Sequence, residues 1–312
     1  MAKYFIRRLL LTVLVVFGVI LIVFTILSLT PGDPGRMILG AMAKQEAVDQ
    51  LNHELGFDQP FLVRLWEYLK NILLHFDFGN SYTSKKPVFD EIWARFPVTL
   101  KLALFSALFS SIIGVGLGVL SAVKQYSILD NICSVSAMFF ASAPDFWVGL
   151  MLLSIFAVKL KWLPSFGIKT ELGYVLPILT LTLYCSAGIL RMTRSSMLEV
   201  VYQDYVRTAR AKGASVRTTI WKHELKNALL PVLTAIGLNF GALFGGAVTT
   251  EMVFSLPGVG SLVITAVKNK DIPQAMAGTI FLATVFSLIM LVVDLIQAFV
   301  DPRVKARYAG EK

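Results

Sequence analysis

Apolar residues gather in six long stretches that are separated by polar segments. A helix of about 20 apolar residues, rising about 1.5 Å per residue, crosses the hydrocarbon core of a membrane, which is about 30 Å thick. Each stretch is close to this length, so the pattern predicts an all-α polytopic membrane protein with six transmembrane helices. The stretches are Leu9–Leu29, Val98–Val123, Ile132–Val158, Tyr174 to about Leu190, Val232 to about Val253, and Gln274–Val300.

The polar segments divide the chain into parts. Residues 1–30 are expected to form the first transmembrane helix, 31–97 an external loop or subdomain, 98–300 the transmembrane core, and 301–312 a cytoplasmic tail. Within the external part, Leu65–Phe76 has the pattern of an amphipathic helix lying at the membrane interface. We expect the first helix to stay uncleaved, because its apolar run is long for a signal peptide and no A-x-A-like site follows it.

The polar segment 200–231 predicts two short helices with a break between them. Gly213 is placed to end the first helix, since glycine adopts the left-handed conformation without steric cost, and Ser215 is placed to cap the second. Pro231 marks the start of the next apolar stretch. A basic helix pair of this kind is either a docking element for a partner or an ordinary basic loop. Three apolar residues of the second helix fall near one face: Val216, Ile220 and Trp221.

Composition and charge agree with a membrane protein and indicate its orientation. The chain is 56% hydrophobic and 16% charged, whereas soluble domains carry about 25% charged residues. The net charge of +9 would suggest nucleic acid in a soluble protein. Here the basic residues of the short loops concentrate on one side of the predicted spans, and the positive-inside rule then places both termini and segment 200–231 in the cytoplasm. We therefore expect no nucleic-acid partner.

The residues that commonly carry metal or catalytic chemistry are scattered. The histidines are His53, His75 and His223, and the cysteines are Cys133 and Cys185. They form no ligand pattern and no disulfide framework. The sequence also contains no phosphate-binding loop of the G-x-x-x-x-G-K-[ST] type. We expect no metal site, no bound cofactor and no enzymatic activity in this chain.

Six short motifs, in their order and spacing, resemble the dipeptide/oligopeptide/nickel permease family of bacterial ATP-binding-cassette (ABC) importers. The resemblance covers essentially the whole chain, although the acid of the family's general EAA loop is replaced by Arg207. The loop from Gly213 to Pro231 is also longer than in the general form, and both departures resemble the peptide/nickel branch. The motifs are Thr30–Pro34, Asp77-Phe78-Gly79 with Ser81, Asp204–Gly213, Asn227–Pro231, Leu256–Gly260 and Asp301-Pro302-Arg303.

The resemblance implies a division of labour in the bacterial inner membrane. This chain would have the type I importer permease fold and would form the translocation path with a second homologous permease, surrounded by membrane lipid. Two cytoplasmic ATPase subunits would use ATP and Mg, and an external solute-binding protein would deliver the substrate. Segment 200–231 would then receive the movement of the ATPases. The residues expected to carry this coupling are Arg210, Lys212, Gly213, Ser215, Val216, Arg217, Ile220 and Trp221.

Three acidic residues lie in or beside the apolar stretches, where a charge is costly and often functional. Asp145 follows Pro144, where the third span can kink, and Asp145 and Glu251 are candidates for the translocation path. Asp294 is expected to pair with a nearby basic residue such as Arg191 or Arg194. The residues expected to dock the external binding protein are Pro257, Gly258 and Gly260.

Two alternatives to peptide uptake stay open at this point. Nickel or a metal chelate is a substrate of the same family, and a chelate needs no protein ligand. A channel or secondary transporter is more distant, because such a protein would not need a basic cytoplasmic helix pair and would often show internal repeats. Copurification of an ATPase and a second permease distinguishes an importer permease from a channel.

Overall fold

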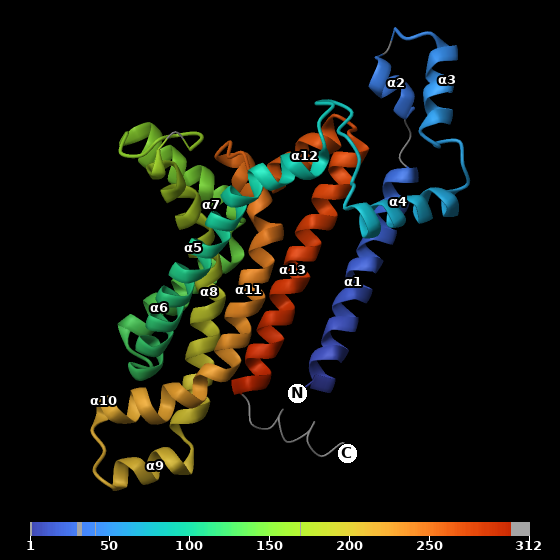
Figure 1. The fold of residues 1–312 in the computed structure, drawn as a ribbon. Coiled ribbons are helices and arrows are strands. Elements are labelled where there is room, and N and C mark those ends of the chain that lie inside the picture. Colours follow the sequence, from blue (N-terminus) through green and yellow to red (C-terminus); the bar gives the residue numbers. More distant parts are fainter. Residues whose placement is uncertain (1, 30–32, 41, 169, 301–312) are drawn as a thin grey trace.

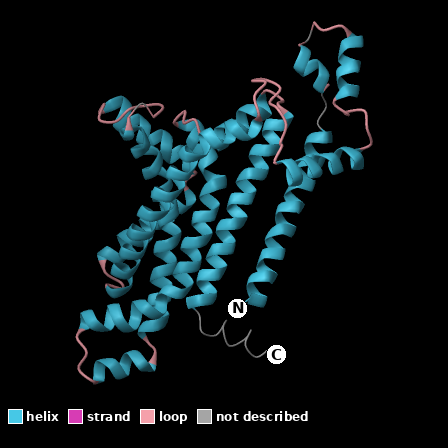
Figure 2. Cartoon of the chain, viewed as in Figure 1, coloured by secondary structure: helices cyan, strands magenta, loops and turns pink. Residues whose placement is uncertain are grey.

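The computed structural model describes residues 2–29, 33–40, 42–168 and 170–300. Over these residues the chain folds into helices joined by loops, without a β-strand, as the sequence predicts (Figures 1 and 2). The tail 301–312 and residues Thr30, Pro31 and Gly32 lie outside the described residues. The helices are α1 (Ala2–Leu29), α2 (Pro34–Leu39), α3 (Gln45–Glu54), α4 (Phe61–His75), α5 (Val88–Val123), α6 (Ile128–Ser142), α7 (Asp145–Leu152), η1 (Leu153–Lys159), η2 (Glu171–Tyr174), α8 (Val175–Val201), α9 (Asp204–Ala211), α10 (Val216–Thr218), η3 (Thr219–Glu224), α11 (Leu225–Val253), α12 (Val259–Lys268) and α13 (Ile272–Val300).

Five of the described helical segments are long and apolar enough to cross a membrane, and a bent helix pair supplies the sixth span. The pair consists of α6 and of α7 with η1, and the two halves meet at an angle of 106°. Pro144 stands at the break, and Ala143 before it has the extended conformation (φ −74°, ψ 132°) that a following proline favours. The predicted kink is therefore a full break of the third span.

Several helices extend beyond the apolar stretches that predict them. α5 begins at Val88 rather than Val98, because Val88 and Ile92 are buried against Val259 and Leu262 of α12. Pro97 thus lies inside a helix instead of ending the polar segment 31–97. Pro231 likewise lies inside α11. In both cases helical structure continues through the proline, as is common in membrane spans where neighbouring helices satisfy the freed backbone groups.

The core forms where α5, α8 and α11 cross. Leu102, Leu181 and Phe244, one from each helix, are buried in a single cluster. Gly114 of α5 lies directly against Ile189 of α8, and a Cβ on this glycine would stand 2.7 Å from the Cβ of Ile189. Small residues at such positions let two helix backbones approach closely. α5 and α8 therefore pack closely against each other.

Two of the three glycines that the sequence places on one face of α11 contact α13. Gly237 faces Val293, and Gly241 faces Phe286. A Cβ on Gly241 would stand 3.0 Å from the ring of Phe286. Gly245, by contrast, has no neighbour within 4 Å of that position. Only the first two glycines therefore serve the close approach that the spacing predicts.

We expect Gly237→Ala to destabilise the purified chain by about 1–3 kcal/mol, because the new methyl group would overlap Val293. Gly245→Ala is the matched control, since the added methyl group meets open space and alanine favours a helix. Thermal unfolding of the two variants in detergent measures the difference. Equal unfolding temperatures would contradict the close packing of α11 on α13.

The first and last spans lie together, as Figure 1 shows for α1 and α13. Arg8 of α1 pairs with Asp294 of α13 at 3.0 Å. Asp294 thus has the basic partner that the sequence predicts, but this partner is Arg8 and not Arg191 or Arg194. Residues from opposite ends of the chain meet here, which spacing along the sequence does not reveal.

The segment between α1 and α5 gathers at one end of the bundle (Figure 1). Its helix α4 begins four residues before the predicted amphipathic helix, at Phe61, and lies across the end of α1. The loop after α4 is held by the buried carboxylate of Asp271, which accepts hydrogen bonds from the Ser81 hydroxyl at 2.5 Å and the Thr83 amide at 3.1 Å. This segment is therefore fixed to the start of α13.

Candidate functional site

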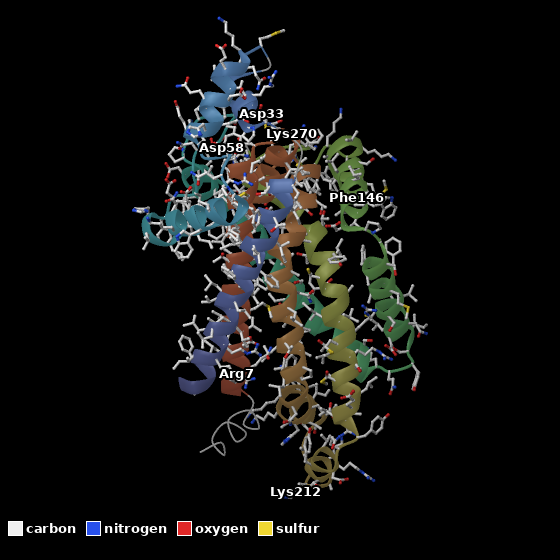
Figure 3. The ribbon with its side chains drawn as sticks, turned by 90° about the vertical axis from the view of Figure 1, so that its right-hand side faces the viewer. Arg7, Asp33, Asp58, Phe146, Lys212 and Lys270 are labelled. Carbon is white, nitrogen blue, oxygen red and sulfur yellow. The ribbon has the colours of Figure 1, made fainter. Side chains whose placement is uncertain are left out.

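The polar segment between α8 and α11, residues 202–224, extends beyond the bundle at the end opposite α2–α4 (Figure 1). We call it the α9–η3 segment. Figure 3 shows Lys212 of this segment at one extreme of the molecule and Asp33 and Asp58 at the other. The segment is continuous with two spans, because α8 runs to Val201 and η3 passes directly into α11.

The break between the two short helices is built as the sequence predicts. Gly213 has a φ of +85°, which glycine adopts without strain, and a Cβ here would meet nothing within 4 Å. The glycine is thus required by backbone conformation and not by packing. Ser215 caps the second helix, since its hydroxyl accepts a hydrogen bond from the Thr218 amide at 3.3 Å.

An ion pair fixes the two helices of the segment to each other. Arg210 of α9 donates to the carboxylate of Glu224 at 2.7 Å, and Glu224 is only 2% exposed. Val206 of α9 is fully buried beside them. From the sequence, Arg210 is expected among the residues that couple to the ATPases, and Glu224 is not singled out. The structure gives Arg210 a partner within the chain.

The apolar side chains of the second helix separate into two groups. Ile220 packs against Val119, Met197 and Leu225, so it belongs to the chain's own core. Val216 and Trp221 are 75% and 60% exposed. Trp221 therefore contributes little to packing within the chain, and its exposed ring is open to a neighbour outside the chain, either a protein partner or the lipid headgroups. The Lys and Arg residues of the segment are also exposed: Arg207, Arg210, Lys212, Arg217 and Lys222.

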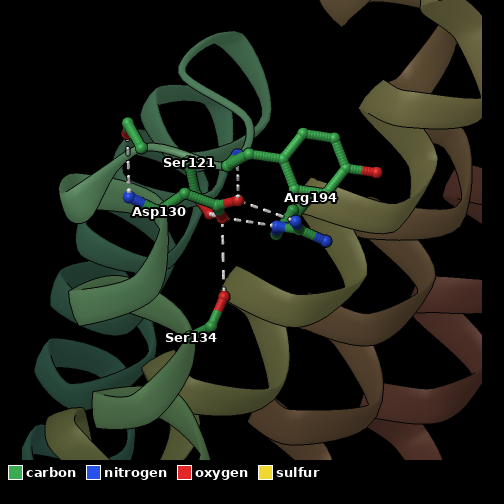
Figure 4. Close-up of polar contacts among 6 residues, drawn as sticks. Ser121, Asp130, Ser134 and Arg194 are labelled. Atoms are coloured by element: carbon green, nitrogen blue, oxygen red, sulfur yellow. Dashed lines mark hydrogen bonds and ion pairs between the residues drawn. The ribbon is translucent and has the colours of Figure 1, made fainter.

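A second polar cluster joins the α5–α6 turn to α8 at the same end of the bundle (Figure 4). Arg194 donates from Nε and Nη2 to the two carboxylate oxygens of Asp130, at 2.7 and 2.9 Å. Ser121 and the Tyr126 amide donate to the same carboxylate at 2.5 and 2.9 Å. Asp130 is 2% exposed, so this bidentate pair locks α6 to α8. Sequence reasoning missed this pairing because Asp130 resembles an ordinary turn residue.

Asp145 stands at the break of the third span, as the first residue of α7. Its carboxylate accepts a hydrogen bond from the Thr249 hydroxyl of α11 at 2.6 Å. The side chain is partly exposed. The structure therefore places Asp145 at a surface shared by α7 and α11.

Glu251 is fully buried within the chain. Its carboxylate accepts hydrogen bonds from the Thr99 hydroxyl at 2.6 Å and the Ser261 amide at 2.8 Å, and Thr99 in turn accepts from the Val259 amide. The residue thus joins α5, α11 and α12. An enclosed carboxylate with these partners fits a structural role and does not support the predicted place in the translocation path.

Two of the three residues predicted to dock an external protein serve this same carboxylate. A Cβ on Gly258 would overlap the carboxylate of Glu251, and one on Gly260 would stand 3.0 Å from it. Both glycines are buried, while Pro257 is exposed. The glycines therefore enclose Glu251 and are not available to a partner, which corrects the prediction for Gly258 and Gly260.

The described residues contain no group of three or more His, Cys, Asp or Glu side chains that could hold a metal ion. Both cysteines are free and buried.

Known proteins match this chain along nearly its whole length. Residues 114–306 match the family described as binding-protein-dependent transport system inner membrane component, and residues 1–103 match the N-terminal model of the same kind of protein. The dipeptide transport system permease protein DppB of Alkalihalophilus pseudofirmus is 40% identical over 98% of this chain and 100% of its own length. The chain belongs to this family of transport permeases.

Other relatives agree with that assignment. The glutathione transport system permease protein GsiC of Escherichia coli K12 is 39% identical to this permease, over 98% of this chain and 99% of its own length. A chain of the MetNI methionine ABC transporter, solved in an inward-facing conformation, superposes with a TM-score of 0.57 at 21% identity, covering 68% of this chain and 96% of that one. This likeness shows the fold alone, and it confirms the predicted importer-permease fold.

The family assignment also gives the general role of the chain. It is a multi-pass permease of an ABC importer in the bacterial inner membrane. Permeases of this kind are not enzymes, since separate ATPase subunits of the transporter hydrolyse ATP.

Proposed function

We propose that this permease forms, with a second homologous permease, the path for uptake of di- or oligopeptides. Two cytoplasmic ATPase subunits that use ATP and Mg drive the transport, and an external solute-binding protein delivers the substrate. The names of the relatives support this substrate class, because a dipeptide and glutathione both consist of amide-linked amino acids.

The α9–η3 segment is the proposed contact with an ATPase. The observation that carries this proposal is the exposure of Val216 and Trp221 beyond the end of the bundle, on a segment that the Arg210–Glu224 pair holds rigid. Exposed aromatic and aliphatic side chains on a rigid element are typical anchors of a protein interface. The exposed cations Lys212 and Arg217 would form its rim.

The connections of this segment suggest how movement reaches the spans. Because α8 leads into α9 and η3 continues as α11, a displacement of the segment shifts both spans together. The Asp130–Arg194 pair extends the same displacement from α8 to α6. The spans would have two arrangements, and ATP would bind more tightly to the transporter in one of them. ATP binding would therefore favour that arrangement.

The surface at the broken third span is the proposed place of the translocation path. Asp145 and its partner Thr249 supply polar groups between α7 and α11, where the path needs hydrogen-bonding groups within a membrane span. At the end of the bundle that carries α2–α4, the exposed Pro257 is the remaining candidate for contact with the binding protein.

Affinity purification of the tagged permease from membranes of its host tests the assembly. We expect an ATPase and a second permease to copurify in stoichiometric amounts. Vesicles containing the complex, its binding protein and ATP should accumulate a labelled dipeptide. Absence of the ATPase would indicate a channel or secondary transporter, and ATP-driven uptake of a nickel chelate without uptake of peptide would contradict the proposed substrate.

A further inference from the structure

A cavity of about 770 Å³ lies at the end of the bundle opposite the α9–η3 segment. Its walls come from α1, α2, α3, α4, the loops on either side of α4 and the start of α13. The functions proposed above make no use of it. The cavity is large enough for the headgroup and part of the chain of an amphipathic molecule.

Two residues in the wall of this cavity each carry a buried polar atom that has no hydrogen-bond partner among the described residues. The Nε of Arg64 and the hydroxyl of Tyr68 are both inaccessible to solvent, and neither makes a hydrogen bond within the described part of the chain. Both residues line the cavity from α4, one helical turn apart and thus on the same side of that helix. Burial raises the pKa of the Tyr68 phenol, so this group stays a neutral hydrogen-bond donor. Buried donors without partners indicate a missing acceptor.

The other charged residues of the cavity are exposed or already engaged. Lys85 is exposed and donates from Nζ to the Ile38 carbonyl at 3.2 Å, and Asp77 is exposed and accepts from the Gly79 amide at 2.8 Å. Glu67 is exposed at the rim. The charged side chains of the lining thus balance in number, and among them Arg64 is the cation with a buried donor that has no partner among the described residues, so its guanidinium is the group that an anionic ligand would meet.

One wall of the cavity is apolar and belongs to two membrane spans. Leu27 comes from the last turns of α1, and Met276 comes from the first turns of α13. α4 also carries exposed apolar side chains, with Leu62, Trp66 and Leu73 each more than two-thirds exposed. A helix with such a face lies at the boundary between the headgroups and the hydrocarbon of a membrane. The cavity thus opens at the depth where lipid headgroups lie.

We propose that this cavity binds a membrane phospholipid. Its phosphate would accept hydrogen bonds from the guanidinium of Arg64 and the hydroxyl of Tyr68, and one acyl chain would lie along Leu27 and Met276. A planar guanidinium suits a phosphate oxygen pair. A soluble anion lacks the apolar portion that the two spans require, and a peptide would bring amide groups for which that wall has no partners. The bound lipid would join α1, α4 and α13.

Native mass spectrometry of the purified transporter, in a detergent free of phosphate, tests the proposal. The probes are dioctanoylphosphatidylglycerol, inorganic phosphate and trialanine. We expect the lipid to bind at least about tenfold more tightly than either soluble probe. Arg64→Gln removes a charged hydrogen-bonding partner and should weaken lipid binding by about tenfold or more, and Tyr68→Phe should weaken it less because it removes one neutral donor.

Lys70→Gln is the matched control, because Lys70 is an exposed cation on the same helix and does not line the cavity. It should leave lipid binding unchanged. Gel filtration shows whether Arg64→Gln disturbs the fold. Tyr68→Phe removes a single oxygen atom, so it tests the site even in that case. If the wild type, the Tyr68→Phe variant and the Arg64→Gln variant all bind the lipid with the same affinity, the proposal is overturned. So would trialanine or phosphate binding as tightly as the lipid.

Discussion

Trp221→Ala is expected to reduce the amount of ATPase that copurifies with the permease by about tenfold or more. The side chain is 60% exposed on the rigid α9–η3 segment, and removal of an aromatic anchor from the centre of an interface costs about 2 kcal/mol or more. Quantitative immunoblotting of the purified complex measures the loss, and peptide uptake should fall with it. The level of the permease in the membrane should not change, because Trp221 contributes little to the chain's own core.

Trp162→Ala is the control for this experiment. Trp162 is 68% exposed but lies in the loop after η1, toward the opposite end of the bundle from the α9–η3 segment. Its removal should leave the ATPase bound. If Trp221→Ala retains the ATPase at the wild-type level, the α9–η3 segment is not the docking surface proposed here. Loss of the ATPase in both variants would instead indicate a general effect on assembly.

Arg194→Ala is expected to lower the stability of the permease by about 3 kcal/mol. The substitution leaves the carboxylate of Asp130, which is 2% exposed, without its bidentate partner. A buried charge that loses its partner commonly costs about 3–5 kcal/mol. Thermal unfolding in detergent should show a transition several degrees lower, and uptake should fall because α6 is no longer fixed to α8.

A double-mutant cycle separates the ion pair from other effects of the substitution. Asp130→Asn in the Arg194→Ala background removes the stranded charge and should recover part of the lost stability. Arg191→Ala is a neighbouring control, since Arg191 is exposed and makes no ion pair with the described residues. Similar unfolding temperatures for Arg191→Ala and Arg194→Ala would contradict the bracing role of the Asp130–Arg194 pair.

The apolar spans and the helix break were predictable because they follow from local rules. A run of apolar residues has to be helical in a membrane, and Gly213 and Ser215 act on the backbone within one turn of themselves. These features need no knowledge of the other helices. The α9–η3 segment, its cap and its exposed Val216 could therefore be located before the fold was known.

The partners of the charged side chains could not be predicted in the same way. Arg210 pairs with Glu224, Arg194 with Asp130, and Arg8 with Asp294. Each pair joins different helices, so it depends on how those helices cross. The apolar pattern specifies which segments cross the membrane but not which of them are neighbours.

Glu251 shows why composition alone misplaces a residue. An acid at the end of a span has the pattern of a transport residue, yet the neighbouring Gly258 and Gly260 leave space for its carboxylate in the interior. The sequence therefore predicted that the glycines of the Leu256–Gly260 motif contact the external binding protein, whereas in the structure they contact Glu251 of the same chain. The place of this motif among the others indicated the family, but the contacts of its residues could not be predicted from the sequence.

The contact between α1 and α13 has a consequence for how the protein is made. Arg8 leaves the ribosome near the start of synthesis, and its partner Asp294 leaves near the end. The first span therefore spends most of translation in the membrane without the helix that holds it. Completion of the fold depends on the arrival of the last span, so a permease shortened before α13 would lack the Arg8–Asp294 contact between its first and last helices.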